Sequence, residues 1–376
     1  MPKLYGYFRD TAPRREALAD GEGGGELFAG LYDLEKMGWE VDINLLRSPG
    51  TVAHHLGTWM SSYLHRHGGY GGDFARCLTT CRRANRADVV WSHADTLGIP
   101  LSLFKACGLI RPPLVYTSIG LVERFRALPE SRWKHRQMRA LRRCAAMVGY
   151  GWEEVQVLKE WFPETPVHFL PYGVDTEQWK PLDRPKTVDV LSLGMDWQRD
   201  FSCLIPFALA HPDRTVKIIT SRHLQSALGA VPANVELCDP VPLPRIPDEM
   251  AAARVIALPV KENTYSGATT TLLQAMAMAL PVVVSEVGAI RGGYGFRERE
   301  SCLLVPPGEP GALSATLYRL LENASLRSET GSRARRQVVD SFGWPVFVKA
   351  WNLILKGVFD GHCRSSSLAG CQDESS

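Results

Sequence analysis

The chain has 376 residues, of which 45% are hydrophobic and 22% charged, with a formal net charge of +3. These values are typical of a globular protein, and the length favours two domains over a single core. The charge is too small to indicate a nucleic-acid-binding protein. The sequence contains no run of about 18 apolar residues, so it predicts no membrane-spanning helix. The first residues, MPKLYGYFRD, lack the apolar core of a signal peptide, and nine cysteines without a close repeated spacing favour a reduced, cytoplasmic protein.

Short apolar segments alternate with helical stretches along most of the chain. Three glycines, Gly23 to Gly25, precede a helix that we expect to begin near Glu26. The predicted β-strands are residues 89–93, 114–118, 147–150, 167–170, 188–193, 216–220, 235–238, 255–260, 281–285 and 302–305. The intervals between most of them are long enough for a crossover helix, which predicts an α/β protein with parallel sheets and helices on both faces. In such sheets ligands bind beyond the carboxyl ends of the strands.

The segment 171–186 predicts a linker, because it contains three prolines and a glycine among polar residues. We therefore expect a first domain over residues 1–172 and a second over 173–342. A last helix is expected over residues 343–359. The small, polar tail at 360–376 is expected to be disordered.

A threonine-rich loop, an apolar helix and a buried strand follow one another in residues 261–285, KENTYSGATTTLLQAMAMALPVVVS. Pro281 ends the helix, and the β-branched run after it predicts the strand. The first N–H groups of a helix have no intrahelical partner and lie at the positive end of its dipole, so they favour an anion such as phosphate. Gly267 permits close backbone approach, and the hydroxyls of Thr269, Thr270 and Thr271 bind phosphate or cap the helix. A loop that only caps a core helix is the alternative.

The string LLQAMAMALPVVVSEVG resembles the LLEAMAxGxPVVxxxxG signature of family-4 glycosyltransferases, which have the GT-B fold. Similar segments lie at residues 21–43, 170–181, 191–201 and 302–327. The resemblance implies two Rossmann-like, doubly wound parallel-sheet domains facing a cleft, with the last helix packed back on the first domain. It also implies a retaining, metal-independent hexosyltransferase without a cofactor. Such an enzyme moves a sugar from a nucleoside-diphosphate sugar to the hydroxyl of a glycan, a lipid-linked or a small-molecule acceptor.

The resemblance also implies where the donor binds. In the family, two glutamates eight positions apart contact the donor sugar and the ribose, and here these positions carry Ser266 and Gln274. The implied donor-binding residues are Ser266, Gly267, Ala268, Thr269, Thr270 and Gln274. Gln274 still donates and accepts hydrogen bonds, but it lacks the stronger, charge-assisted bond of a carboxylate. Glu262 is a candidate to replace the missing carboxylate.

Arg199 is the first catalytic candidate, and it follows a strand that ends at Gly194. The family clamps the diphosphate after this glycine with an arginine and a lysine. Met195 takes the first of these places and Arg199 the second. A guanidinium binds phosphate bidentately and stabilises a departing diphosphate. A surface arginine beside Asp200 is the alternative.

His93 and the glycine run are weaker candidates. His93 ends a strand and is a candidate acid, base or ligand, although the family's histidine follows a later strand that reads YTSI here. A structural histidine is the alternative. Gly24 and Gly25 resemble the family's first-domain glycine loop beneath the donor, and a flexible turn is the alternative. We interpret Cys77 and Cys81 as core thiols, because no second close pair accompanies them as metal ligands.

One face of a predicted helix carries Arg132, Arg136, Arg139 and Arg143. Such a stripe binds anionic lipid headgroups, which implies a peripheral position at the inner face of a membrane. A solvated helix face is the alternative, and no aromatic ladder indicates nucleic acid.

Two other functions are compatible with the sequence. One is a non-catalytic GT-B homologue that binds a sugar nucleotide or a partner enzyme, which the two missing glutamates and Met195 favour. The other is a GT-B sugar-nucleotide epimerase, which needs acidic and histidine residues across the cleft.

Overall fold

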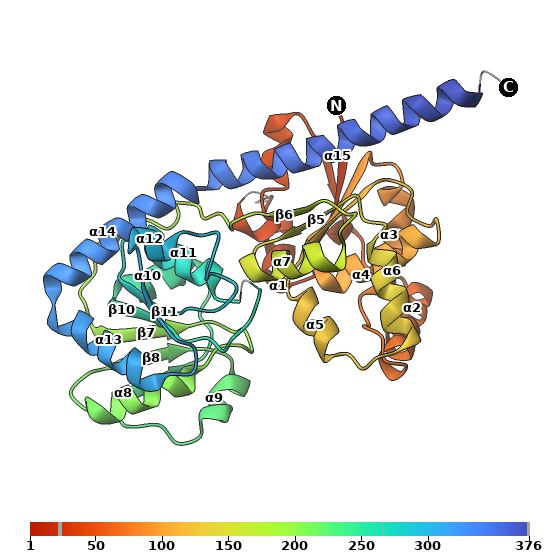
Figure 1. Cartoon of the computed structure of the whole chain (residues 1–376). Helices are drawn as coiled ribbons and strands as arrows, with labels where there is room; N and C mark the ends of the chain where they lie inside the picture. The colour runs from red at the N-terminus through yellow and green to blue at the C-terminus, as the bar shows by residue number, and fades with distance from the viewer. Residues whose placement is uncertain (22–24, 266, 374–376) are drawn as a thin grey trace. The chain divides into compact units, whose positions relative to one another are not determined.

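The computed structural model describes residues 1–21, 25–265 and 267–373, and the chain divides into two compact units. Unit 1 comprises Met1–Tyr150, Glu154–Leu170 and Phe347–Ser376, and unit 2 comprises Gly151–Glu153 and Pro171–Val346. Figure 1 follows the chain from red at the N-terminus to the dark blue C-terminal helix. The chain leaves unit 1 at Leu170, at the start of the proline-containing segment that predicts a linker.

Unit 1 is built on a six-stranded parallel sheet in the order β2-β1-β3-β4-β5-β6. Its strands are β1 (Lys3–Tyr7), β2 (Glu40–Ile43), β3 (Val89–Ser92), β4 (Leu114–Ser118), β5 (Ala146–Gly149) and β6 (Val167–Phe169). The central strands β3, β4 and β5 are buried along their whole length, as expected when helices cover both faces of a parallel sheet. The strand order reverses between β1 and β3, and ligands bind at such a point in doubly wound sheets.

Seven α-helices lie in the first part of the described chain. They are α1 (Ala12–Ala19), α2 (Thr51–Arg66), α3 (Phe74–Ala84), α4 (Asp95–Ala106), α5 (Leu121–Ala127), α6 (Arg132–Leu141) and α7 (Trp152–Trp161). The helix expected near Glu26 is instead two short 3-10 helices, η1 (Glu26–Phe28) and η2 (Tyr32–Met37); η3 is Asn44–Leu46. Ala29 and Gly30 separate η1 from η2 with φ values of 49° and 82°. These left-handed residues end a right-handed helix, so a continuous helix does not form.

Unit 2 contains a second six-stranded parallel sheet, in the order β12-β11-β10-β7-β8-β9. Its strands are β7 (Val188–Leu193), β8 (Val216–Ile219), β9 (Val235–Cys238), β10 (Ala253–Leu258), β11 (Val282–Ser285) and β12 (Leu303–Val305). Its helices are η4 (Phe201–Leu204), α8 (Ile205–Ala210), α9 (Arg222–Leu228), η5 (Leu243–Arg245), α10 (Ile246–Ala251), α11 (Thr269–Ala277), α12 (Phe296–Arg299), α13 (Pro310–Glu322) and α14 (Ala324–Ser341). The strand order reverses between β7 and β10.

All ten predicted strands are confirmed, with ends that differ by at most two residues. The strands β1 and β2 were not predicted. The sequence of β1, KLYGY, contains a glycine, and that of β2, EVDI, contains two acidic residues at the edge of the sheet. Neither segment shows the continuous apolar run that identifies a buried strand.

The C-terminal helix α15 (Trp344–Asp373) belongs to unit 1 from Phe347 onward. Its Trp351 ring lies 4.3 Å from the Trp91 ring, and Trp39 Nε1 donates to Asn352 Oδ1 at 2.9 Å. The helix extends through residues 360–373, where the sequence predicts a disordered tail. In the described part of the chain, no helix combines the length and the apolar character needed to span a membrane.

Candidate functional site

The loops that follow β7 and β10 meet where the strand order of unit 2 reverses. Arg199 and Val260 form an antiparallel bridge, and Lys261 N donates to Gln198 O at 2.8 Å. Asp200 N donates to Pro259 O at 3.0 Å, so backbone bonds hold the two loops together. The helix α11 begins a few residues later. This arrangement brings Arg199 and the threonine-rich loop, which are about 70 residues apart in the sequence, to one edge of the sheet.

The guanidinium of Arg199 is buried and only partly hydrogen-bonded. The residue is 4% exposed, and its Nη2 donates to Thr271 Oγ1 at 3.0 Å. Its Nε and Nη1 have no hydrogen-bond partner among the described residues. Burial lowers the pKa of Arg199 to about 10, while the nearby Asp196 and Tyr265 act in the opposite direction. The side chain therefore carries a positive charge at neutral pH in a place where charge is costly.

A glycine makes room for this side chain. Gly194 has a φ of +145°, and a Cβ atom added there would lie 2.4 Å from Arg199 Nε. The Gly194 carbonyl oxygen accepts a hydrogen bond from Thr220 Oγ1 at 2.7 Å, which fixes the end of β7. The backbone conformation and the packing both require glycine at this position.

The start of α11 faces the same loops. Ala268, at the N-cap position, makes no side-chain cap, so the first-turn N–H groups have no partner from a capping side chain. Thr269 is buried and Thr270 is partly exposed. The Gly267 N–H donates to the Tyr265 carbonyl oxygen at 3.0 Å, so it is not one of the uncapped N–H groups at the start of the helix. Ser266 lies outside the described residues.

Asp196 and Tyr265 belong to the site, but sequence reasoning missed them. The Tyr265 hydroxyl hydrogen-bonds to both carboxylate oxygens of Asp196, at 2.8 and 2.9 Å. Asp196 Oδ1 also accepts from Gln198 N at 2.8 Å, which forms an Asx turn. The Asp-x-Gln spacing was the local signal for that turn, whereas the contact with Tyr265 had no signal in the sequence.

The position of the missing family carboxylate is occupied by a buried amide. Gln274 lies in the second turn of α11 and is 8% exposed. Glu262, the candidate substitute, is engaged elsewhere. Its Oε1 accepts from Gly288 N at 2.7 Å, and its Oε2 accepts from Arg291 Nη2 at 2.9 Å. Met195, which takes the place of a family arginine, is exposed.

In unit 1, His93 lies in an aromatic environment at the end of β3. Its ring stacks on Phe8 with centroids 5.2 Å apart, and its Nε2 pairs with the Tyr150 hydroxyl at 2.8 Å. Burial, with a smaller contribution from the positive charge of Arg14, lowers the pKa of His93 to about 3. A neutral, buried imidazole with such a low pKa is a poor general base near pH 7. These contacts favour the structural alternative for His93.

A polar pocket of about 550 Å³ lies where the strand order of unit 1 reverses. Arg9 and Asp10 follow β1, and Thr96 lies at the start of α4, after β3. The other polar residues that line the pocket are His54, Thr58, Ser61, Ser62, Asp73 and Arg76. Carboxylates and hydroxyls in one cavity suit a ligand that is rich in hydroxyl groups.

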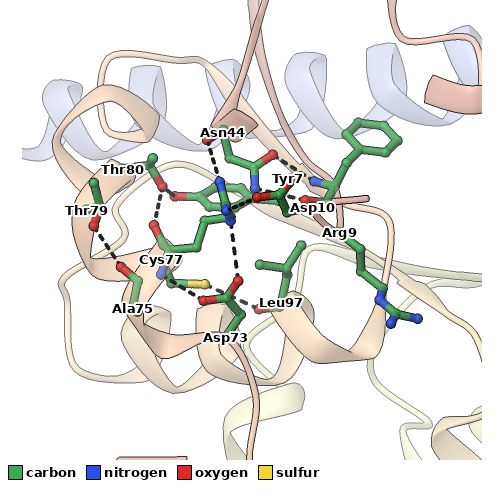
Figure 2. Close-up of polar contacts among 12 residues, drawn as sticks. Tyr7, Arg9, Asp10, Asn44, Asp73, Ala75, Cys77, Thr79, Thr80 and Leu97 are labelled. Atoms are coloured by element: carbon green, nitrogen blue, oxygen red, sulfur yellow. Dashed lines mark hydrogen bonds and ion pairs between the residues drawn. The ribbon is translucent and has the colours of Figure 1, made fainter. Parts of the chain in front are cut away.

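Arg76 organises this pocket. Its Nη2 donates to Asp10 Oδ2 at 2.6 Å, and its Nε donates to Asp73 Oδ2 at 3.3 Å. Figure 2 shows Asp10, Asn44 and Asp73 gathered around these contacts, with Arg9 extending away from them. The guanidinium is buried and is neutralised by two carboxylates that keep partial exposure. Sequence reasoning missed this cluster, because its members come from separate elements and match no motif.

A second pair of carboxylates is fully enclosed in unit 1. Asp95 accepts from the Tyr116 hydroxyl at 2.5 Å and from Arg124 Nε at 3.1 Å. Glu154 Oε1 accepts from Ser118 Oγ at 2.7 Å, whereas its Oε2 has no partner among the described residues. Burial, together with the negative charge of Asp95, raises the pKa of Glu154 to about 8. Glu154 therefore holds a proton at neutral pH.

The structure does not place the remaining predicted residues in these sites. Gly25, with a φ of 79°, precedes η1 and has no atom within 4 Å of an added Cβ, whereas Gly24 lies outside the described residues. The thiols of Cys77 and Cys81 on α3 contact backbone carbonyl oxygens. No three His, Cys, Asp or Glu side chains in the described ranges are grouped so that they could hold a metal ion. The arginines Arg132, Arg136, Arg139 and Arg143 are exposed on or just after α6.

Comparison with known proteins places this geometry in a known fold. The family model described as Glycosyl transferases group 1 matches residues 210–323, a range that holds α11 but not Arg199. Sucrose-phosphate synthase from Thermosynechococcus elongatus superposes with a TM-score of 0.69 at 13% identity, over 96% of this chain and 100% of that one. Anabaena HepE in complex with UDP-glucose superposes with a TM-score of 0.64 at 16% identity, over 94% and 99% of the two chains.

The chain has the GT-B fold. Two observations decide this point. The chain contains two six-stranded parallel sheets, and its superposition on sucrose-phosphate synthase covers the whole of that chain. Among curated proteins, the MMP alpha-(1->4)-mannosyltransferase of Mycolicibacterium hassiacum is 26% identical over 189 residues, 47% of this chain. The match spans only 45% of that mannosyltransferase. In this GT-B chain the candidate site of unit 2 lies at the carboxyl edge of its sheet, where doubly wound folds bind ligands.

Proposed function

We propose that this GT-B protein is a glycosyltransferase that moves a sugar from a nucleoside-diphosphate sugar to an acceptor hydroxyl. The observation that carries the proposal is the buried, partly unsatisfied cation of Arg199 beside the uncapped start of α11. A positive side chain against the positive end of a helix dipole is unfavourable unless an anion joins them. A diphosphate supplies that anion, and the similarity to glycosyltransferases of the same fold supports a sugar nucleotide as its source.

In this proposal the main task of unit 2 is electrostatic. As the glycosyl bond breaks, negative charge grows on the departing diphosphate, and Arg199 with the amides from Ala268 onward stabilises it. The pair Asp196–Tyr265 holds the two loops in place. Because Nε and Nη1 of Arg199 are inaccessible to solvent, donor binding requires the guanidinium or the threonine-rich loop to shift toward the phosphates. Such a shift makes binding of the donor a conformational step.

We further propose membership of glycosyltransferase family 4, transfer with retention of configuration, and independence of a metal ion. The LLQAMAMALPVVVSEVG signature supports the family assignment. A guanidinium and helix amides provide the positive charge that the leaving group needs, which supports metal independence. An NMR assay of the product anomer tests retention. Full activity in the presence of a chelator tests metal independence, and restoration by a divalent cation would contradict it.

The acceptor is proposed to bind in the polar pocket of unit 1. The carboxylates of Asp10 and Asp73 accept hydrogen bonds from ligand hydroxyls, and the pocket volume suits a sugar-sized group. A reduced compartment such as the cytoplasm is proposed as the place of action. The eight cysteines whose side chains are described are free thiols, which supports this location.

A donor screen tests the proposed function. Binding and hydrolysis of UDP-, GDP- and ADP-sugars are measured by calorimetry and product release. Tight binding of one donor with slow hydrolysis is expected, and Arg199→Ala should lower turnover by about two orders of magnitude. Donor binding without turnover on any acceptor would favour the non-catalytic homologue. Change of the donor sugar without an acceptor would favour an epimerase, and the absence of binding to every nucleotide sugar would refute the proposal.

A further inference from the structure

The helix α2 exposes a stripe of large apolar side chains. Val52, Leu56 and Trp59 recur at intervals of four and three residues, so they lie on one face, and they are 82%, 46% and 55% exposed. The opposite side of the helix is anchored in unit 1 through the buried Gly57 and Leu64. Residues 51–67 contain histidines and an arginine but no acidic residue. An apolar stripe of this kind on a structured helix is a mark of an interaction surface.

The exposed face of the neighbouring helix α6 is basic. Arg132, Arg136 and Arg139 lie on it, and Arg142 and Arg143 follow its last residue. None of these five arginines forms an ion pair within the described chain, whereas Lys134 on the same helix pairs with Glu130 at 2.6 Å. Five unpaired guanidinium groups concentrate positive charge at one place on a protein whose net charge is only +3.

An aromatic chain joins the two helices, both of which are labelled in Figure 1. The Trp59 ring stacks on Tyr63 with centroids 5.5 Å apart, and Tyr63 meets the edge of Trp133 at 5.8 Å. The guanidinium of Arg136 lies 4.8 Å from the Trp133 ring centroid. The apolar stripe of α2 and the arginines of α6 therefore form one continuous surface, with tryptophan and tyrosine between them. We call it the α2–α6 surface.

We propose that the α2–α6 surface docks on an anionic lipid bilayer. Arginines bind the headgroup phosphates, the aromatic rings lie at the headgroup level, and Val52 and Leu56 enter the acyl boundary. Charge complementarity commits the surface to an anionic partner. The exposed side chains of Val52 and Leu56 offer no hydrogen-bonding groups, which favours a bilayer over an acidic protein.

The docking does not rest on glycosyl transfer, but it has a consequence for the proposed acceptor site. His54, Thr58 and Ser61 of α2 line the polar pocket of unit 1. The same helix thus carries the membrane-facing stripe and one wall of the pocket. A docked protein therefore holds this pocket one helix diameter, roughly 10 Å, from the bilayer surface, within reach of acceptors that are attached to lipids.

Sedimentation with vesicles tests the proposal. Wild-type protein should sediment with vesicles of equal parts phosphatidylglycerol and phosphatidylcholine at low salt, and not with phosphatidylcholine alone. The triple variant R136Q/R139Q/R143Q should bind about a hundredfold more weakly, because each charge contributes on the order of a factor of five near an anionic surface. The matched control R245Q/R319Q/R336Q removes three exposed arginines of unit 2 and should bind like wild type.

A second variant separates insertion from simple attraction. L56S/W59S should weaken binding at least tenfold with little dependence on salt, whereas the effect of the arginine variant should fade as salt screens the charges. Leu209→Ser, at an exposed leucine of unit 2, is the control. Circular dichroism and thermal unfolding confirm that each variant is folded.

Three results would overturn the proposal. The first is wild-type protein that stays in solution with anionic vesicles at low salt. The second is equal loss of binding in the arginine variant and its control, or unchanged binding of L56S/W59S. The third is lipid-independent self-association in the ultracentrifuge that L56S/W59S abolishes, which would assign the surface to a second copy of the chain. None of these results bears on nucleotide-sugar binding, so the proposed function is tested separately.

Discussion

Replacing Arg199 with methionine should make the ligand-free protein more stable while it removes donor binding. Burial lowers the pKa of Arg199 from its ordinary value to about 10, which corresponds to about 3 kcal/mol of free energy spent on keeping the charge enclosed. Methionine has a similar length, fills the space beside Gly194 and carries no charge. The change also removes the bond from Nη2 to Thr271, which is worth about 1.5 kcal/mol for a charged donor. The expected net gain is about 1 to 2 kcal/mol.

The assay is urea denaturation with and without the nucleoside diphosphate, or its sugar, that the donor screen identifies. In wild-type protein the nucleotide should raise the free energy of unfolding, by about 2.7 kcal/mol at a hundred times its dissociation constant. In Arg199→Met it should have little effect. Arg319→Met, at an exposed arginine of the same unit, should change stability by less than about 0.5 kcal/mol and leave nucleotide binding intact.

A loss of stability in Arg199→Met would refute this reasoning. It would mean that the guanidinium is a structural group of the β7–β10 loops, satisfied by Asp196 and Thr271, rather than a charge held for a ligand. A stabilised variant that binds the nucleotide as tightly as wild type would also separate the buried charge from the donor.

Three further predictions concern buried titratable or polar positions. Gln274→Glu should lower the stability of the free protein, because the position is buried. If the side chain faces the ribose, the change should also raise donor affinity by roughly tenfold. Calorimetry measures both the stability and the affinity. The pKa of Glu154 is raised to about 8 in the folded protein. As the pH rises from about 5 to 8, wild-type protein should therefore lose up to about 1.4 kcal/mol of stability per pH unit relative to Glu154→Gln. A parallel dependence in both proteins would contradict this, and Glu160→Gln, at the exposed end of α7, is the control. The pKa of His93 is lowered to about 3, so wild-type protein should lose stability relative to His93→Gln as the pH falls below about 6.5, and equal acid sensitivity in urea titrations would show that His93 is not enclosed.

The fold was predictable from the sequence, whereas a donor site in unit 2 was implied by the family resemblance. Strand positions follow from short apolar runs, and their spacing predicts parallel sheets, because both signals are local. The ten strands found at the predicted positions confirm this expectation. Strands β1 and β2 were not predicted, because a glycine and acidic residues interrupt their apolar patterns. Arg199 contacts Thr271 in the first turn of α11, whereas in the sequence only the family resemblance assigned these two segments to one donor site.

The physical state of the site residues was decided only by the tertiary structure. Nothing in the sequence around Arg199 shows that its guanidinium is enclosed, that Asp196 meets Tyr265, or that the amide of Gly267 is already paired. The same holds for His93, an ordinary strand-end histidine in the sequence, which packing against Phe8 and Tyr150 keeps neutral. Burial and pairing depend on neighbours that are tens or hundreds of residues away.

The surfaces show the same division. The arginine stripe of α6 is visible in the sequence as a helical periodicity, and so is the apolar pattern at Val52, Leu56 and Trp59. Periodicity alone does not tell whether an apolar stripe faces the core or the solvent, because both produce the same pattern along one helix. The structure decides that the α2 stripe is exposed and that Trp133 connects it to the arginines. The sequence by itself therefore determined which residues share a face, and the packing of distant segments determined what that face meets.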